Sequence, residues 1–475
     1  MSKKQRIVGF QDIENNNFSE SCPSKDEYAV KLMTFEEIKR IIIFEKDSVK
    51  LNDFIAMGLI PNINMTLHQH PYHSLLITAI LSNSYECALI LIECGADINQ
   101  RSGLNGNDSA LAYISRTGSL ANIKFLLNSG FIVNDDILYH CIDESIKRRN
   151  VGVVLLLIPL MSSVDHHPLI TRPILHLACY FDCNEVVKLL LERGADFTRI
   201  SLGDGVDALG IAAGRGFLDI VYMIVNWVKG AVSTGSLNAA LLRACANGQV
   251  EVVRYLISKG AEVDYISPFG VKPLQLVIAH KHLSSLEFLL DSDVSVNAIM
   301  PDGATALCYA CRLSSANIAE CLLRRGADIN STDNSGNTPL YYSILEPYML
   351  KVLLNYGADL NDPFASGDTV LLACVRWTCS NRKPLAKITH LLDQGADVNL
   401  AHTHTGETAL MLGVLAQYTE LVELLLERGA DVTAINSNGH TVLDMLGGSS
   451  LHVRIAELCY LYIDSNRQSL KAILK

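Results

Sequence analysis

Short apolar runs at helical spacing, separated by polar turns, recur along this chain, and residues 326–361 hold the clearest copy. Residues 340–345 and 349–354 carry apolar side chains at the spacing of two short helices. Thr338-Pro339 predicts the start of the first helix, because Thr caps free N–H groups and Pro is tolerated in the first turn. The copy begins and ends on Gly-Ala-Asp-x-Asn, and this glycine predicts a helix end because it enters the left-handed region without a Cβ clash. Each predicted helix is too short to be stable alone.

The closing phrase returns at a nearly constant interval. Clear copies begin at Gly95, Gly194, Gly260, Gly326, Gly357, Gly395 and Gly429, and weaker copies begin at Gly58, Gly130 and Asp293. The separation between Asp293 and Gly326, for example, is 33 residues. The two intervals that end at Gly194 and at Gly260 span 64 and 66 residues, so each has room for one further, degenerate unit. The pattern predicts about twelve to thirteen units.

Several predicted first helices share an opening motif. The matching stretches are Thr338-Pro339-Leu340, Thr305-Ala306-Leu307, Thr408-Ala409-Leu410, Leu175-His176-Leu177-Ala178-Cys179 and Leu241-Leu242-Arg243-Ala244-Cys245, with a middle glycine at Gly118, Gly216 and Gly248. With these motifs in register, residues 34–464 resemble the ankyrin repeat family, whose unit is a β-turn and two antiparallel helices with the pattern Thr-Pro-Leu-His-x-Ala. The resemblance implies an all-α ankyrin-repeat solenoid, which is an elongated curved stack. It also implies a concave face, lined by the turns and the first helices, that binds other proteins and catalyses nothing.

We divide the chain into a flexible N-terminal arm at residues 1–33, the repeat array at 34–464 and a C-terminal tail at 465–475. The array is degenerate around 131–170 and 200–240, where the motifs weaken or disappear. Degenerate units weaken both interfaces that they share with their neighbours. We therefore predict that residues 131–170 are the least stable part of the array.

One unit is about five residues longer than the others between its two helices, through residues 377–384. We expect a lengthened loop there. Trp377 in that loop either packs against the loop itself or forms a second contact site.

Composition narrows the class of protein. Hydrophobic residues make up 49% of the chain and charged residues 19%, which is too apolar for a disordered protein. The net charge of −11 argues against a large nucleic-acid-binding face. The polar N-terminus does not resemble a signal peptide, and the longest apolar run, residues 151–161, is too short to span a bilayer. The 13 cysteines are scattered and lie mostly in apolar segments, as in a reducing compartment. We therefore expect a cytoplasmic monomer with no membrane span and no nucleic-acid partner.

We predict no catalytic, cofactor-binding or metal-binding residue. There is no glycine-rich phosphate-binding motif. Cys308 and Cys311 lack the second ligand pair that zinc requires, and they lie where the family has packing residues. The histidine clusters are His68, His70 and His73, and His402 with His404, and we expect both clusters to lie in solvated turns.

Contact with a partner is expected at turn tips and on first helices. By register with the family, these positions are Pro268, Phe269, Met300, Asp302, Thr332, Asn334, Tyr341, Tyr342, His402, His404 and Asn438. Phe269 either anchors a partner as an exposed aromatic residue or folds back onto the next turn. Tyr341 and Tyr342 are adjacent, so one can face the partner while the other packs.

The function we expect is that of a non-catalytic scaffold or adaptor for protein–protein interaction. It would act in a host cytosol if the owner is an intracellular bacterium that delivers effectors. One alternative is an enzyme with a site hidden in the degenerate units at 131–240. Another is an adaptor that recruits a ubiquitin ligase through a C-terminal helix at 451–475. Asn99, Asn330, Asn361 and Asn399 lie where ankyrin proteins are sometimes hydroxylated, although they also fit a role as turn-stabilising residues.

Overall fold

The computed structural model describes residues 34–64, 74–100, 109–165, 172–201, 205–227, 232–292, 294–300, 302–344, 346–381, 383–446 and 450–473. Within these residues the chain is all-α, and its β-type pairing consists of isolated bridges such as those of Ile299 with Thr305 and Ala401 with Thr408. The predicted N-terminal arm and the cluster of His68, His70 and His73 lie outside the described residues. The chain divides into two compact units, residues 1–163 and 164–475, which are described separately.

The first unit contains four helix pairs. They are α1 (Phe35–Arg40, continued by η2, Ile41–Glu45) with α2 (Ser48–Ala56), α3 (Leu75–Leu81) with α4 (Tyr85–Glu93), α5 (Ala110–Thr117) with α6 (Leu120–Asn128), and α7 (Asp135–Lys147) with α8 (Val151–Leu157, followed by η3, Ile158–Leu160). The first helices α1, α3, α5 and α7 pack against one another in chain order. Each pair thereby covers the apolar faces that the neighbouring pair leaves open.

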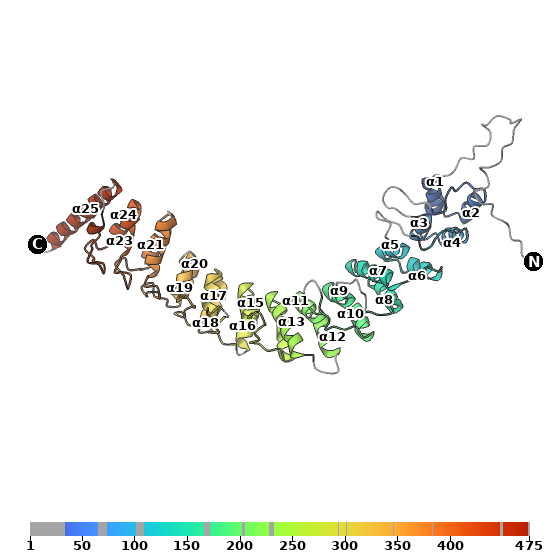
Figure 1. Ribbon diagram of the computed structural model, residues 1–475, viewed down its shortest axis with the longest axis horizontal. Coiled ribbons are helices and arrows are strands. Elements are labelled where there is room, and N and C mark those ends of the chain that lie inside the picture. The colour runs from blue at the N-terminus through green and yellow to red at the C-terminus, as the bar shows by residue number, and fades with distance from the viewer. Residues whose placement is uncertain are drawn as a thin grey trace, which may run out of the picture. The chain divides into compact units, whose positions relative to one another are not determined.

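The second unit continues the same arrangement with eight pairs. They are α9 (Ile174–Tyr180) with α10 (Asn184–Glu192), α11 (Ala208–Arg215) with α12 (Leu218–Trp227), α13 (Thr234–Ala246) with α14 (Val250–Ser258), α15 (Pro273–Ala279) with α16 (Leu283–Asp291), α17 (Ala306–Arg312) with α18 (Ala316–Arg324), α19 (Pro339–Ser343) with α20 (Pro347–Asn355), α21 (Val370–Asn381) with α22 (Ala386–Asp393), and α23 (Ala409–Leu415) with α24 (Thr419–Glu427). The chain then forms η4 (Leu443–Met445) and α25 (Ser450–Ile473), which packs on α24. Figure 1 shows these pairs following one another in chain order. The predicted number of units is confirmed, and α25 includes residues 465–473, which we expected to form a tail.

Short polar residues start many of the first helices. The hydroxyls of Thr305 and Thr408 accept hydrogen bonds from the backbone N–H groups of Cys308 and Met411, both at 3.3 Å. Thr338 is different, because its side chain makes no capping hydrogen bond and Pro339 occupies the first helical position instead.

The Gly-Ala-Asp-x-Asn phrase encodes a hydrogen-bonded link between repeats. Asp397 Oδ1 accepts from the N–H of Asn399 at 2.8 Å and so closes its own turn. Asn361 Oδ1 accepts from the N–H of Asp397 in the next repeat at 2.9 Å. The same hydrogen bond to the backbone N–H of the following repeat joins Asn64 with Asp97, Asn99 with Ile132, Asn297 with Asp328 and Asn399 with Asp431. The turn-stabilising role is therefore confirmed for Asn99, Asn361 and Asn399, whereas Asn330 makes no such bond among the described residues.

The predicted loop at Trp377 is wrong. Most of the additional residues lengthen α21, so Trp377 is helical, and Lys387 Nζ lies 5.2 Å from the centre of its ring. A continued helix keeps the backbone hydrogen bonds that a longer loop would lose, which explains the outcome.

Candidate protein-binding groove

One of the connections between repeats in the second unit is much shorter than the others. Elsewhere in this unit, 14 or 15 residues connect a second helix to the next first helix, whereas six residues connect α12 to α13. The helix that follows is longer in compensation: α13 has 13 residues, against 8 in α11 and 7 in α15. The first unit repeats this pattern, since six residues connect α6 to the 13-residue α7. The two regions that we predicted to be degenerate are thus the two that lack a full hairpin.

A hollow of about 410 Å³ lies over α13 in the second unit. Its floor is one face of α13, made of Gly235, Ser236, Ala239, Leu242 and Arg243. One wall is the hairpin before α11, through Thr198, Ile200, Gly205, Val206 and Asp207, and the other is the hairpin before α15, through Tyr265, Ser267, Pro268 and Phe269. We call this hollow the α13 groove. Its volume lies in the range of natural ligand sites.

Phe269 projects from the wall nearest α15. Its side chain is 92% exposed, so it does not fold back onto the next turn. The turn that carries it is closed by hydrogen bonds, because Ser267 N–H donates to Val271 O at 2.9 Å and Gly270 N–H donates to Ser267 O at 2.8 Å. The opposite wall presents Ile200, which is 64% exposed. Two large apolar side chains therefore face solvent on either side of one hollow.

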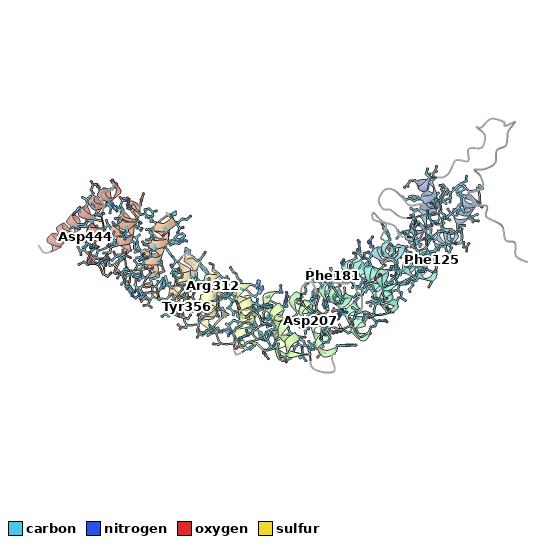
Figure 2. The ribbon with its side chains drawn as sticks, in the orientation of Figure 1. Phe125, Phe181, Asp207, Arg312, Tyr356 and Asp444 are labelled. Atoms are coloured by element: carbon cyan, nitrogen blue, oxygen red, sulfur yellow. The ribbon has the colours of Figure 1, made fainter. Side chains whose placement is uncertain are left out.

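Among the described residues of the α11 wall, Asp207 is the charged one, and it caps the N-terminus of α11. Its Oδ1 accepts from the N–H of Gly210 at 2.7 Å. Burial raises the pKa of the Asp207 carboxyl, although hydrogen bonds from Gly210 and from Ser236 act in the opposite direction. No cation of the described residues forms an ion pair with it. Figure 2 labels Asp207 in the part of the chain where Figure 1 places α11 and α13.

The predicted contact residues divide between this groove and other hairpins. Pro268 and Phe269 line the groove, and the other predicted positions do not. On the other hairpins, the exposed positions are Asp302, Thr332, Asn334, His404 and Asn438. Several of these hairpins are tied to a neighbour, as when Asn334 Nδ2 donates to Asp302 O at 3.0 Å. The structure therefore does not gather the predicted residues into one site.

Two predicted contact residues are part of the internal structure. The side chain of Met300 is 2% exposed, because its position in the hairpin faces the core, as the buried Phe364 does two repeats later. This departs from the expected exposed position. His402 is half-buried and holds its turn together: Nδ1 accepts from the N–H groups of His404 and Thr405 at 3.2 and 3.1 Å, and Nε2 lies 3.0 Å from Ser366 O.

The two adjacent tyrosines differ in exposure, and contact of either one with a partner stays a prediction. Tyr342 is half-buried and donates to the Asp333 carboxylate, and both burial and this hydrogen bond raise the pKa of its phenol. Tyr341 is the more exposed of the two and packs edge-on against Phe364, with the ring centres 5.3 Å apart. Neither residue lines the α13 groove.

The cysteines at positions 308 and 311 lie in the packed interior, as expected for packing residues. Cys308 and Cys311 are buried, and Cys311 Sγ lies 3.7 Å from Met349 Sδ. Among the described residues, no group of three or more His, Cys, Asp or Glu side chains is placed to hold a metal ion. Of the helices described, none combines the length and the apolar character that crossing a bilayer requires.

Sequence reasoning did not find Ile200, Asp207 and the α13 face. A signal for them was present, because the 66 residues between Gly194 and Gly260 contain no second Gly-Ala-Asp phrase. We interpreted that gap as a degenerate unit and did not infer an opening between two complete hairpins.

Helix pairs that repeat along both units, with hairpins and first helices left accessible, define a helical repeat protein. A model of tandem ankyrin repeats, described as "Ankyrin repeats (3 copies)", matches residues 76–201, 175–267, 241–333, 274–364 and 373–469. The chain belongs to the ankyrin repeat family, whose domains are typically protein-binding modules.

Individual relatives are similar only in part. The chain is 30% identical over 179 residues to the palmitoyltransferase AKR1 of Lachancea kluyveri, which covers 36% of this chain and 24% of that protein. It is 24% identical over 210 residues to the putative ankyrin repeat protein L371 of Acanthamoeba polyphaga mimivirus, covering 42% of this chain and 27% of that protein. The crystal structure of the ankyrin repeat domain of Bcl-3 is 26% identical, with a TM-score of 0.41, over 46% of this chain and 97% of that domain. The chain thus spans about a quarter of the length of these two curated relatives.

Proposed function

We propose that this protein acts by binding a segment of a partner protein in the α13 groove, and that binding rather than catalysis is its activity. The observation that carries the proposal is the position of Phe269 and Ile200, two exposed apolar side chains on opposite walls of one hollow. Aromatic and aliphatic residues beside a pocket are common anchors of protein interfaces. A groove floored by a helix and walled by two closed turns is also preorganised, which lowers the entropic cost of binding.

The chemistry of the lining supports binding more than catalysis. Among the described residues, the groove lining presents hydroxyls, the carboxylate of Asp207 and the guanidinium of Arg243, and it includes no histidine or cysteine. A Ser–His or Cys–His pair, a common arrangement in covalent catalysis, is therefore not among these residues. The scaffold or adaptor role, the cytoplasmic location and the monomeric state that we expect remain predictions.

A second candidate contact lies on α25. This helix exposes Val453, Tyr460 and Leu461, which supports the alternative of an adaptor that recruits a ubiquitin ligase. Replacing Tyr460 and Leu461 by serine should then abolish recovery of ligase components in a pull-down and leave ligands of the α13 groove bound. Unchanged recovery would rule this alternative out.

The main proposal is tested by selecting binders from a random 12-residue peptide library on the full chain. Peptides that bind the groove should lose at least about tenfold in affinity for Phe269→Ala. The matched control is Phe44→Ala, which removes another exposed phenylalanine from the first unit and should leave the affinity unchanged. A selection in which no peptide depends on Phe269 would contradict the proposal.

A further inference from the structure

The charge of the α13 groove indicates what its occupant contains. We propose that the bound segment carries a lysine or arginine next to a bulky apolar residue, with the cation paired to Asp207 and the apolar side chain lying between Ile200 and Phe269. This inference rests on the proposed function and adds the chemical class of the partner segment.

Asp207 occupies the position that caps the first helix of its repeat. In three other repeats of the second unit the residue that caps the first helix, which is Thr305, Thr369 or Thr408, is buried. The Thr305 hydroxyl, for example, lies 2.8 Å from the Ser331 hydroxyl of the following hairpin. At α11 the following hairpin is the short one, and Ser236 of α13 is the residue that reaches the cap. The cap of α11 therefore borders an open groove.

The residue at the N-cap of α11 is a carboxylate. Among the described first helices, Asp207 is the only carboxylate that serves as N-cap; most of the others begin at Ser, Thr or Asn. Neutral Ser or Asn caps a helix about as well as Asp does. The negative charge is therefore not needed for capping, and it adds a desolvation cost that a neutral residue would avoid.

The charge of Asp207 has no paired cation among the described residues. Burial opposes the charged form of Asp207, and the hydrogen bonds from Gly210, from Ser236 and from its own backbone do not cancel this effect, so its pKa is raised. No lysine, arginine or histidine in the described residues forms an ion pair with it. A cation brought by a partner would supply the missing countercharge in a partly desolvated site, where such a pair is stronger than at the open surface.

Among the described residues, Arg243 is the other charged residue of the lining. It lies on the α13 floor. Its Cβ is close to Gly214, since a Cβ atom on Gly214 would lie 3.5 Å from it. Its side chain is exposed and makes interactions of its own. Water and salt screen an exposed guanidinium more than a partly buried carboxylate. The carboxylate of Asp207 is therefore the stronger determinant of the charge of the occupant.

The test uses the full chain and the peptides selected on it. We expect the Phe269-dependent peptides to share a lysine or arginine next to a bulky apolar residue. Asp207→Asn keeps a capping side chain and removes the charge. It should weaken the cationic peptide about tenfold and leave unchanged a synthetic analogue in which glutamine replaces that lysine or arginine. Asp264→Asn is the control, since it removes an exposed carboxylate of the neighbouring hairpin that does not line the groove.

Three results would overturn the inference. They are Phe269-dependent peptides without a shared cationic residue, equal affinity of the cationic peptide for the parent and Asp207→Asn proteins, and equal weakening of the cationic peptide and its glutamine analogue. Each of them leaves the proposed function standing, whereas a selection without any Phe269-dependent peptide contradicts the proposed function itself.

Discussion

Asn399 joins two neighbouring repeats, because its Oδ1 accepts a hydrogen bond from the backbone N–H of Asp431 at 2.7 Å. Its own N–H is in turn held by Asp397 Oδ1 at 2.8 Å. The same pair of bonds recurs elsewhere in both units. The Gly-Ala-Asp-x-Asn phrase that identifies the repeats therefore also supplies hydrogen bonds between neighbouring repeats.

The first prediction concerns this link. Asn399→Ala leaves the N–H of Asp431 without its partner and should lower the free energy of unfolding by about 1 kcal/mol. The control is Asn438→Ala at an exposed hairpin position, which should stay within about 0.5 kcal/mol of the parent protein. Urea unfolding followed by circular dichroism measures both. Equal stability of the two variants would show that the link contributes nothing.

A second prediction separates two glycines. Gly395 has a φ of +99° and ends α22, so Gly395→Ala should cost about 1–2 kcal/mol although no atom blocks the new methyl group. Gly235 lies in α13 with ordinary helical geometry, and Gly235→Ala should stabilise the protein by about 0.5–1 kcal/mol. Thermal unfolding of the two variants should move in opposite directions. A shift in the same direction would contradict the assigned backbone conformations.

The third prediction is a pH dependence. The pKa of Asp207 is higher in the folded state than the value of about 3.9 expected in the unfolded chain. The folded state therefore binds the proton of Asp207 more tightly than the unfolded state does. The stability that this proton gives the folded state is lost as the pH rises from the pKa of the unfolded state through that of the folded state. Asp207→Asn cannot acquire the charge, so it should unfold at higher urea than the parent protein at pH 7. The difference should shrink towards pH 4, and a difference that grows at low pH would contradict the direction of the shift.

Cysteine reactivity provides a fourth prediction. Burial raises the pKa of the Cys374 thiol to about 11, and that of Cys245 to about 12, so few thiolates form at neutral pH. Cys94 is exposed at the end of α4. Among the described cysteines, Cys94 should therefore be alkylated first by iodoacetamide in the native protein, as read by mass spectrometry. Fast modification of Cys374 or Cys245 before unfolding would show that their repeats open.

Local stability is the fifth prediction, and it was made from the sequence. Residues 131–170 should exchange their amide hydrogens faster than the rest of the array, because their repeat lacks the standard hairpin. The boundary between the two compact units, after Ser163, falls inside this range and supports the expectation. Uniform protection across residues 95–460 would contradict it.

The fold was predictable from the sequence because each repeat marks its own ends. Gly326 and Gly357 enclose one complete helix pair, and the apolar spacing between them places both helices. Met300 was placed wrongly because register with the family identifies a hairpin position but not the side to which its side chain points. Trp377 was placed wrongly because additional residues can lengthen a helix as readily as a loop.

The groove was less accessible to sequence reasoning. Phe269 was identified because an aromatic residue at a turn tip is conspicuous in one repeat alone. Asp207 and Leu242 belong to two different repeats, and they share a surface only because the hairpin between them is short. A groove that lies beside an unusually short connection between repeats has no sequence motif of its own.

The most direct test of the account compares two isoleucines. Ile200 and Ile435 each lie six residues after a closing glycine and are each 64% exposed, but only Ile200 lines the α13 groove. Isothermal titration calorimetry of a selected peptide should find about tenfold weaker binding to Ile200→Ala and unchanged binding to Ile435→Ala. Equal dissociation constants for the two variants would contradict the claim that this protein binds its partner in the groove.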